Sequence, residues 1–389
     1  MTTTPTPQFS RMSLNILMLV SVVLIVIFAA PASKQAQPPL PKAPKINAQV
    51  WLSDSGSQVW YSPHLSSTIE IQLWFKAGYR YDGEFKGRAN LLAQLLKYQS
   101  TQQQLPMQIS LDQDFIKIAL HLSTSAVHLK QQIDKTVALL YRPTLSNNIL
   151  RQLRLAHHSV SQDLRQQVYG QHAYAGPRQG TEKSLKRISR ADLQKFQQQH
   201  LHPKRLFASI VGDLTEHSAQ IIMETLLPPS KYKAASVQTL APLKTSFVSQ
   251  NNMMVMVKPG LAHLGKAEQY QQLVNNYLLL QVLDILQPSQ SKWINGRSNN
   301  TLYVQQAALF RQNMLQDIDW DMILRAKRQL AGNWLSQVEE APALSRYLVH
   351  LNAYSLPINH MTKSLQHLQS IDQGSWQQFY QQQLTTLSL

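Results

Sequence analysis

The 389-residue sequence predicts an α+β fold organised as two similar halves. Short segments with the alternating apolar residues of strands stand between longer segments with helical periodicity. A stretch of linker composition separates a first set of such elements from a second set in a comparable order. The segments 188–201 and 371–384 also match without gaps, and the tripeptide Lys-Ser-Leu recurs upstream of each, which supports an internal duplication.

The first half contains three expected strands and five expected helices. The strands are 67–78, 114–123 and 205–214, and the helices are 87–99, 125–142, 147–170, 188–201 and 221–227. Ser189 is expected to cap the helix 188–201, with Asp192 in its first turn. The aromatic-rich segment 50–64 favours two hairpin strands that cover the core. Its alternative role is an exposed edge that pairs with a peptide or another subunit.

The second half repeats this pattern after the linker. The expected elements are a strand at 247–260, a helix at 267–286, a strand at 301–310, and long helices from 321–340 onward. We therefore expect a first domain at 46–228, a linker at 229–244 and a second domain at 245–389.

The N-terminal residues predict an exported protein. A polar tail at 1–11 precedes an uncharged apolar segment at 12–31, which approaches the ~20 residues that span a bilayer. A proline-rich linker follows at 32–45. We expect a single-pass N-terminal transmembrane anchor with a periplasmic or otherwise extracytoplasmic domain. Cleavage of a signal peptide near Ala30, giving a secreted protein, is the alternative.

Composition narrows the classes of function. The formal net charge is +16 and the pI is about 9.9, but no run of five Lys or Arg residues and no glycine-rich phosphate loop occurs. These observations exclude an ordinary nucleic-acid-binding module and favour an acidic partner or lipid headgroups. Because cysteine is absent, disulfides, thiol catalysis and cysteine zinc sites are excluded.

The segment 169–215 resembles the pitrilysin/insulinase-type zinc peptidases of family M16, which include the mitochondrial processing peptidases. Gly180-Thr181-Glu182, Asp192-Leu193 and Val211-Gly212-Asp213 occupy motif positions of that family. Upstream, the segment 73–96 resembles the family's zinc-motif region, and Gly78, Arg80, Gly87 and Ala89 align with it. The resemblance implies two α+β domains, each with an antiparallel sheet and packed helices.

The same resemblance predicts an inactive chain. The family's H-x-x-E-H motif supplies two zinc ligands and a general base from one helical face. Here the first histidine is replaced by Asn90, the glutamate by Ala93 and the second histidine by Gln94. No glutamate lies between Glu84 and Glu182 to act as the third ligand. We expect no catalytic residue, no metal and no cofactor.

Two further groups of residues are candidates for binding. The resemblance offers Arg297 and Tyr303 as the family's substrate-backbone-binding pair, although the surrounding pattern is absent. The pairs His157-His158 and His200/His202 are expected to be structural. Adjacent helical residues point apart, and histidines at a helix end usually cap carbonyls or face water.

The leading hypothesis is a membrane-anchored, catalytically inactive M16-like subunit. Its expected partner is an active M16-type zinc peptidase in a hetero-oligomer, or a second copy in a homodimer, and a peptide substrate is compatible with both. A stand-alone peptide-binding or assembly scaffold of the cell envelope is the alternative. An active hydrolase that uses non-standard residues is a third hypothesis.

Overall fold

A six-stranded sheet forms the centre of the N-terminal half. The computed structural model describes residues 39–155, 164–237, 240, 243–244, 246–250, 253–259, 266–286, 291–294, 299–305 and 318–387. The strands are β1 (Gln49–Leu52), β2 (Gln58–Pro63), β3 (Thr68–Phe75), β4 (Met107–Leu111), β5 (Ile116–Ser123) and β6 (Leu206–Gly212). Their order is β1-β2-β6-β3-β5-β4, and every neighbouring pair is antiparallel except β2 and β6. The sheet is therefore mixed, with β1 and β4 at its edges.

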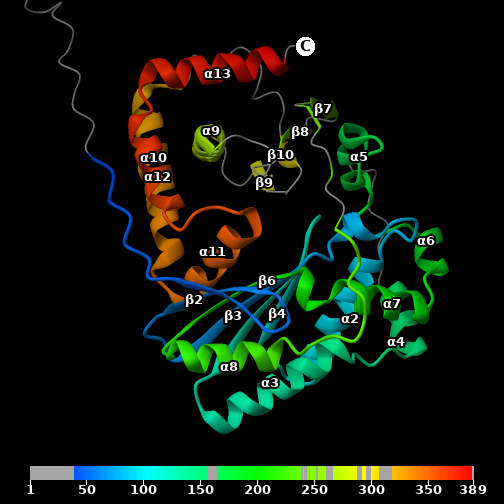
Figure 1. Ribbon diagram of the computed structural model, residues 1–389. Helices are drawn as coiled ribbons and strands as arrows, with labels where there is room; N and C mark the ends of the chain where they lie inside the picture. The colour runs from blue at the N-terminus through cyan, green and yellow to red at the C-terminus, as the bar shows by residue number, and fades with distance from the viewer. Residues whose placement is uncertain are drawn as a thin grey trace, which may run out of the picture. The chain divides into compact units, whose positions relative to one another are not determined.

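Side-chain alternation along β3 gives this sheet two different faces. Ile69, Ile71 and Leu73 are fully buried in the main hydrophobic core. Gln72 and Trp74 project from the opposite face. Helices α2 (Arg88–Gln102), α3 (Ala126–Tyr141) and α8 (Glu216–Leu226) contribute leucines and isoleucines to the core and so cover the first face (Figure 1).

Four further α-helices are described in this half. They are α4 (Asn147–Leu155), α5 (Leu164–Tyr169), α6 (Glu182–Arg187) and α7 (Arg190–His200). The predicted cap of α7 is confirmed, because the Ser189 hydroxyl accepts from Asp192 N at 3.1 Å and the Asp192 carboxylate accepts from Ser189 N at 2.9 Å. The expected helix 147–170 is represented by α4 and α5, and residues 156–163 lie outside the described residues.

A second, four-stranded sheet lies in the C-terminal half. It consists of β7 (Ser246–Gln250), β8 (Met253–Pro259), β10 (Asn299–Gln305) and β9 (Ser291–Ile294), in that order, with antiparallel pairing throughout. The expected single strand at 247–260 is wrong, since β7 and β8 form a hairpin. The helices are α9 (Lys266–Leu286), α10 (Trp320–Leu335), α11 (Ala341–Tyr354), α12 (His360–Ser370) and α13 (Gln373–Leu387).

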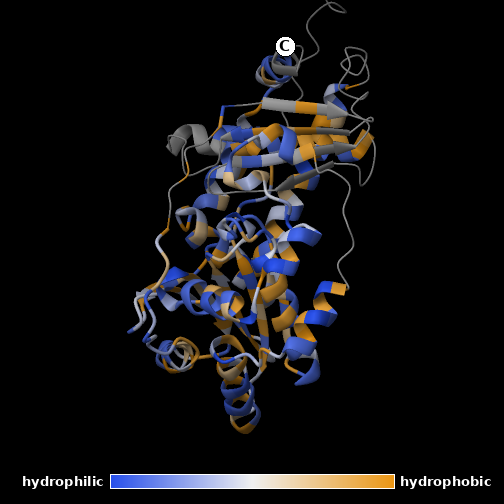
Figure 2. Ribbon diagram, turned by 90° about the vertical axis from the view of Figure 1, so that its right-hand side faces the viewer, coloured by the Kyte–Doolittle hydropathy of each residue, from blue (hydrophilic) through white to orange (hydrophobic). Residues whose placement is uncertain are grey.

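Helix α11 belongs to the C-terminal half in sequence but covers the second face of the six-stranded sheet (Figure 1). The hydroxyls of Ser345 and of Ser209 in β6 are hydrogen-bonded to each other at 3.0 Å, and the Ser345 hydroxyl donates to the Glu70 carbonyl of β3 at 3.2 Å. Asn352 donates to the Gln58 carbonyl of β2 at 3.0 Å. The two halves thus share a core layer. Figure 2 shows that the helices carry hydrophobic and hydrophilic residues on different sides, as amphipathic packing requires.

The internal sequence match corresponds to two similar helical pairs. The helices α6 and α7 are separated by a short break, as are α12 and α13. At the second break, Ser375 N donates to the Asp372 carboxylate at 2.8 Å and Ser375 Oγ accepts from Asp372 N at 3.0 Å. This reciprocal cap has the same form as the Ser189–Asp192 cap of α7, with the two residue types exchanged.

The segment 50–64 forms the predicted hairpin of β1 and β2. Trp60 and Tyr61 are buried, whereas Leu52 on the edge strand β1 is 73% exposed. The alternative role of this segment as a pairing edge stays open, because β1 ends the sheet.

The prediction of a single-pass membrane location requires correction. None of the helices in the described ranges is both long and apolar enough to cross a bilayer. This finding contradicts the expected anchoring, and the transmembrane part of the predicted fold is corrected with it. The apolar segment 12–31 itself lies outside the described residues.

Candidate functional site

Helix α2 carries the three positions that replace the zinc motif. Asn90 and Gln94 are one helical turn apart, so their side chains emerge on the same side, and Ala93 lies beside them. Asn90 is 8% exposed and Ala93 7% exposed, while Gln94 is half-buried. The helix therefore keeps the geometry of a paired-ligand site but presents two amides and a methyl group.

The start of α2 is fixed by a buried carboxylate. Asp82 accepts hydrogen bonds from Gly87 N at 2.7 Å and Ala89 N at 2.8 Å, which satisfies two of the free N–H groups at a helix N-terminus. Burial raises the pKa of Asp82 to about 7, against the lowering effect of those two donors. Arg88 donates to the Asp82 carbonyl at 2.6 Å and closes the turn.

Two glycines bring the loop before α6 against this helix start. Gly87 and Gly180 have φ of +97° and +80°, a region that favours glycine. A Cβ at Gly180 would lie 2.5 Å from the Lys86 carbonyl oxygen, and one at Gly87 would lie 2.8 Å from the Gln179 carbonyl oxygen. Close backbone contact therefore explains why glycine stands at both motif positions.

A buried charged pair supports the loop that leads into α2. Arg80 Nη1 lies 3.0 Å from the Asp114 carboxylate, and the hydroxyl of Tyr174 donates to both oxygens of that carboxylate at 2.8 and 2.9 Å. Gly78 N donates to the Asp114 carbonyl at 3.1 Å. The sequence placed Gly78 and Arg80 in a motif, but Asp114 and Tyr174 become visible as partners only in the fold.

The donor set at the α2 positions does not fit zinc. An amide oxygen is a poor zinc ligand compared with imidazole, and alanine has no proton-accepting group. Throughout the described ranges, no group of three or more His, Cys, Asp or Glu side chains is arranged to hold a metal ion. The expectation that the chain needs no cofactor stays a prediction.

The expected substrate-binding pair is not brought together by any described contact. Arg297 lies outside the described residues. The backbone of Tyr303 lies in β10, where it pairs with Val255 of β8 and Lys292 of β9. The carry-over of these two residues from the family stays a prediction.

The histidines at the end of α7 are structural, but they are buried and do not face water. The ring of His200 stacks on Phe196 at 4.2 Å, and burial beside Arg205 lowers the pKa of His200 to about 3. The side chain of His202 accepts from Lys204 N at 3.1 Å and contacts the Tyr232 carbonyl at 3.0 Å. His157 and His158 lie outside the described residues.

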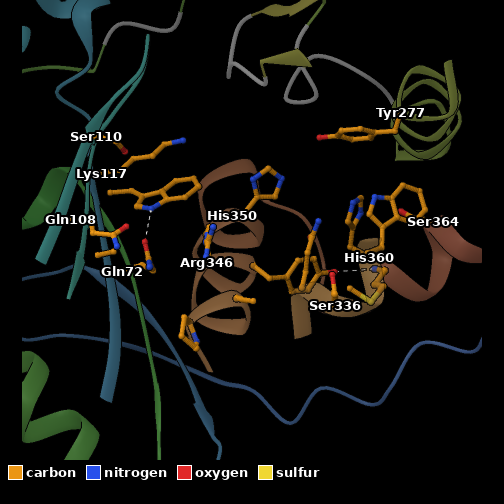
Figure 3. Close-up of a pocket in the computed structure, with 18 of the residues that line it drawn as sticks. Gln72, Gln108, Ser110, Lys117, Tyr277, Ser336, Arg346, His350, His360 and Ser364 are labelled. Carbon is orange, nitrogen blue, oxygen red and sulfur yellow. Dashed lines mark hydrogen bonds between the residues drawn. The ribbon is translucent and has the colours of Figure 1, made fainter. Parts of the chain in front are cut away.

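A cavity of about 800 Å³ lies on the face of the six-stranded sheet opposite α2. Strands β3, β4 and β5 form one wall, and helices α9 to α12 with the turn Ser336–Val338 form the others (Figure 3). The lining residues are Gln72, Trp74, Gln108, Ile109, Ser110, Lys117, Ala119, His121, Leu273, Tyr277, Trp334, Ser336, Gln337, Pro342, Ala343, Arg346, Tyr347, His350, His360, Met361 and Ser364. The cavity combines aromatic surface with basic and amide groups.

These cavity residues belong to no motif in the sequence. The alternation of Gln72 and Trp74 with the core residues of β3 was the available signal, since it marks a second, non-core face. The contribution of Arg346 and His350 from α11 had no local signal, because it depends on a helix more than 200 residues away packing onto that face.

Comparison with known proteins rests on structure alone. No protein-family model matches the sequence, and no curated protein sequence matches it. The structure is similar to a peptidase M16 inactive domain from Pseudomonas fluorescens, with a TM-score of 0.69 and 16% identity over 86% of this chain and 94% of that chain. It is also similar to a protease from Helicobacter pylori, with a TM-score of 0.67 and 13% identity over 87% of this chain and 96% of that chain.

The chain has an M16-like fold. The periplasmic protease PqqL from Escherichia coli is a further match, with a TM-score of 0.62 and 13% identity over 89% of this chain but 47% of that chain. This chain therefore spans about half the length of PqqL. At such identities, similarity to M16 structures establishes the architecture alone. The chemistry depends on the residues of α2 and of the cavity.

Proposed function

We propose that this chain is a catalytically inactive M16-like subunit that binds extended peptide segments and assembles with a zinc-bearing M16 chain. The observation that carries the proposal is the helix α2, which sits in an M16-like fold but has Asn90, Ala93 and Gln94 at the motif positions. Neither amide nor methyl supplies the ligands or the base of zinc-dependent peptide hydrolysis.

The match to half of PqqL supports assembly with a second chain. Because this chain spans 47% of that protease, a second M16-like chain would complete a molecule of comparable length. An inactive half can still form a wall of a shared chamber and hold a substrate. A homodimer is the competing assembly and would contain no zinc motif from this chain.

The edge strand β4 supports the peptide-binding part of the proposal. One side of β4 pairs with β5, and no described strand pairs with its other side. Gln108 and Ser110 are exposed on it, and the cavity begins beside them. An extended peptide can add a strand to such an edge by backbone hydrogen bonds, while its side chains enter neighbouring pockets.

The assembly is tested by affinity purification of the tagged chain from its native cells. The expected result is a stoichiometric partner that carries an intact H-x-x-E-H motif, with peptidase activity that a zinc chelator removes. Recovery of the chain alone or as a homodimer without activity would refute the assembly.

Peptide binding by the isolated chain, with no zinc-bearing partner recovered from cells, would favour a second candidate, a stand-alone peptide-binding protein. Peptide binding is measured by fluorescence anisotropy with an extended glutamine- and valine-rich peptide. The control is the same peptide with alternate amides N-methylated, which cannot pair with an edge strand. Equal binding of both peptides would refute strand addition at β4.

A further inference from the structure

The cavity beside β4 has an unbalanced charge. None of the described residues that line it is an aspartate or glutamate, whereas Lys117 and Arg346 are basic. Burial, together with Lys363 nearby, lowers the pKa of His360 to about 4, and burial also lowers the pKa of His350. Both rings are therefore neutral at pH 7, and the two long basic side chains set the charge of this space.

The two cations differ in how far they are already neutralised. Lys117 Nζ lies 2.6 Å from the Asp112 carboxylate and 4.1 Å from the centre of the Trp74 ring. Arg346 is exposed and forms no ion pair with any residue in the described ranges. The His121 ring is already engaged, because its Nδ1 lies 2.6 Å from the Glu70 carboxylate. Arg346 is thus the stronger attraction for an anion.

The sheet geometry directs a bound peptide toward these cations. Ser110 pairs with Lys117 and Gln108 pairs with Ala119, so all four residues project from the cavity face. A peptide strand added to β4 would lie ~4.8 Å farther along the sheet and would place every second side chain on that face. Figure 3 shows Lys117 and Ser110 extending from adjacent strands toward the helix α11 that carries Arg346 and His350.

We propose that the cavity beside β4 selects extended peptides with acidic side chains at alternate positions, held by Arg346 and Lys117 over the aromatic surface of Trp74. The inference rests on the peptide binding proposed above and adds the class of peptide. Carboxylates at positions i and i+2 face the cations together, whereas those at i+1 face away. Selection therefore depends on the spacing of the acidic residues as well as on their number.

The test uses four labelled peptides of equal length with the purified chain. One has glutamates at i, i+2 and i+4, a second has three consecutive glutamates, and the third and fourth have glutamine or lysine at the alternate positions. Fluorescence anisotropy is measured at about 50 mM and 300 mM salt. The higher salt concentration screens long-range attraction between charges, so the preference that remains comes from close contacts. We expect the alternating acidic peptide to bind about tenfold more tightly than the glutamine peptide and more tightly than the consecutive acidic peptide.

Matched variants separate the cavity from the general basic charge of the chain. Arg346→Gln is expected to lower the affinity for the alternating acidic peptide by about 2–5-fold and to leave the affinity for the glutamine peptide unchanged. Lys117→Gln is expected to have a smaller effect, because Asp112 already neutralises that charge. Arg190→Gln removes a charge that is also exposed, from the start of α7 and outside the cavity lining, and is expected to leave every affinity unchanged.

Each outcome decides a separate claim. Equal weakening by Arg190→Gln and Arg346→Gln would assign the preference to the net charge of +16 and overturn the inference. Equal affinity for the alternating and consecutive acidic peptides would also overturn it. Binding of the glutamine peptide without any acidic preference would remove only the selectivity and keep the proposed peptide binding. Failure of all four peptides to bind would remove both.

Discussion

His200 offers a direct test of how the N-terminal half is stabilised. The residue is 8% exposed, and its ring stacks on Phe196 and lies 5.5 Å from the ring of Tyr81. Burial and the neighbouring Arg205 guanidinium lower the pKa of His200 to about 3. The folded chain therefore holds this imidazole neutral at pH values where the unfolded chain protonates it.

The size and sign of the effect follow from proton linkage. Between about pH 6.5 and pH 3 the unfolded state binds one more proton at this site than the folded state, so stability falls as pH falls. At pH 5 the difference from the ordinary pKa is 1.5 units, and each unit corresponds to about 1.36 kcal/mol. His200 alone should therefore remove about 2 kcal/mol of folding free energy between pH 7.5 and pH 5.

The assay is urea denaturation followed by tryptophan fluorescence at pH 7.5 and pH 5.0, comparing the wild-type chain with His200→Gln. Glutamine has a similar length and does not titrate, so the variant should lose about 2 kcal/mol less on acidification than the wild-type chain. His128→Gln, at an exposed site on α3, should behave like the wild type. If His200→Gln and the wild type lose the same free energy within 0.5 kcal/mol, the assigned burial of this imidazole is wrong.

Three further predictions concern helix α2 and its surroundings. Gly180→Ala should destabilise the chain by about 2–3 kcal/mol, since a Cβ there meets the Lys86 carbonyl at 2.5 Å. As a control, Gly332→Ala at an exposed site in α10 should stabilise the chain by about 0.5–1 kcal/mol. Thermal melting compares the two variants. Asp82→Ala should cost about 2–4 kcal/mol in urea unfolding, because two backbone N–H groups lose their acceptor, and a cost below 0.5 kcal/mol would contradict this cap. The double variant Asn90→His with Gln94→His should bind zinc measurably in calorimetry but show no peptidase activity, because it restores two ligands without the base; activity in this variant would refute the proposed reason for inactivity.

The elements with strong local signals were predictable from the sequence. The alternation in 67–78 marked β3, and the Ser189–Asp192 spacing marked the start of α7. The strand β4 was missed, because its five residues between a helix and a turn are too few for a clear alternation. The replaced zinc positions were recognised from a sequence motif. All of its positions lie in one continuous helix, so recognising it needs no knowledge of distant segments.

Features made by distant segments were not predictable in the same way. The position of α11 on the six-stranded sheet depends on contacts such as Ser345 with Ser209, which are 136 residues apart. Arg346 enters the cavity for the same reason. The periodicity of α11 shows that one side of the helix is apolar. It does not show whether that side packs on the C-terminal half or on the sheet of the N-terminal half. The cavity, and any selectivity based on it, therefore needed the fold.

The environment of Ala93 differs from the one that a catalytic glutamate needs. In an active motif, a glutamate at this position faces a metal ion and its bound water, which stabilise the carboxylate. Here Ala93 is part of the main hydrophobic core and only 7% exposed. Introducing a carboxylate by Ala93→Glu would bury a charge without a cation to stabilise it, which costs several kcal/mol. Around Ala93, helix α2 is therefore stabilised by apolar packing. In the proposed inactive subunit, the edge strand β4 and the cavity beside it are the binding surfaces that the described residues define best.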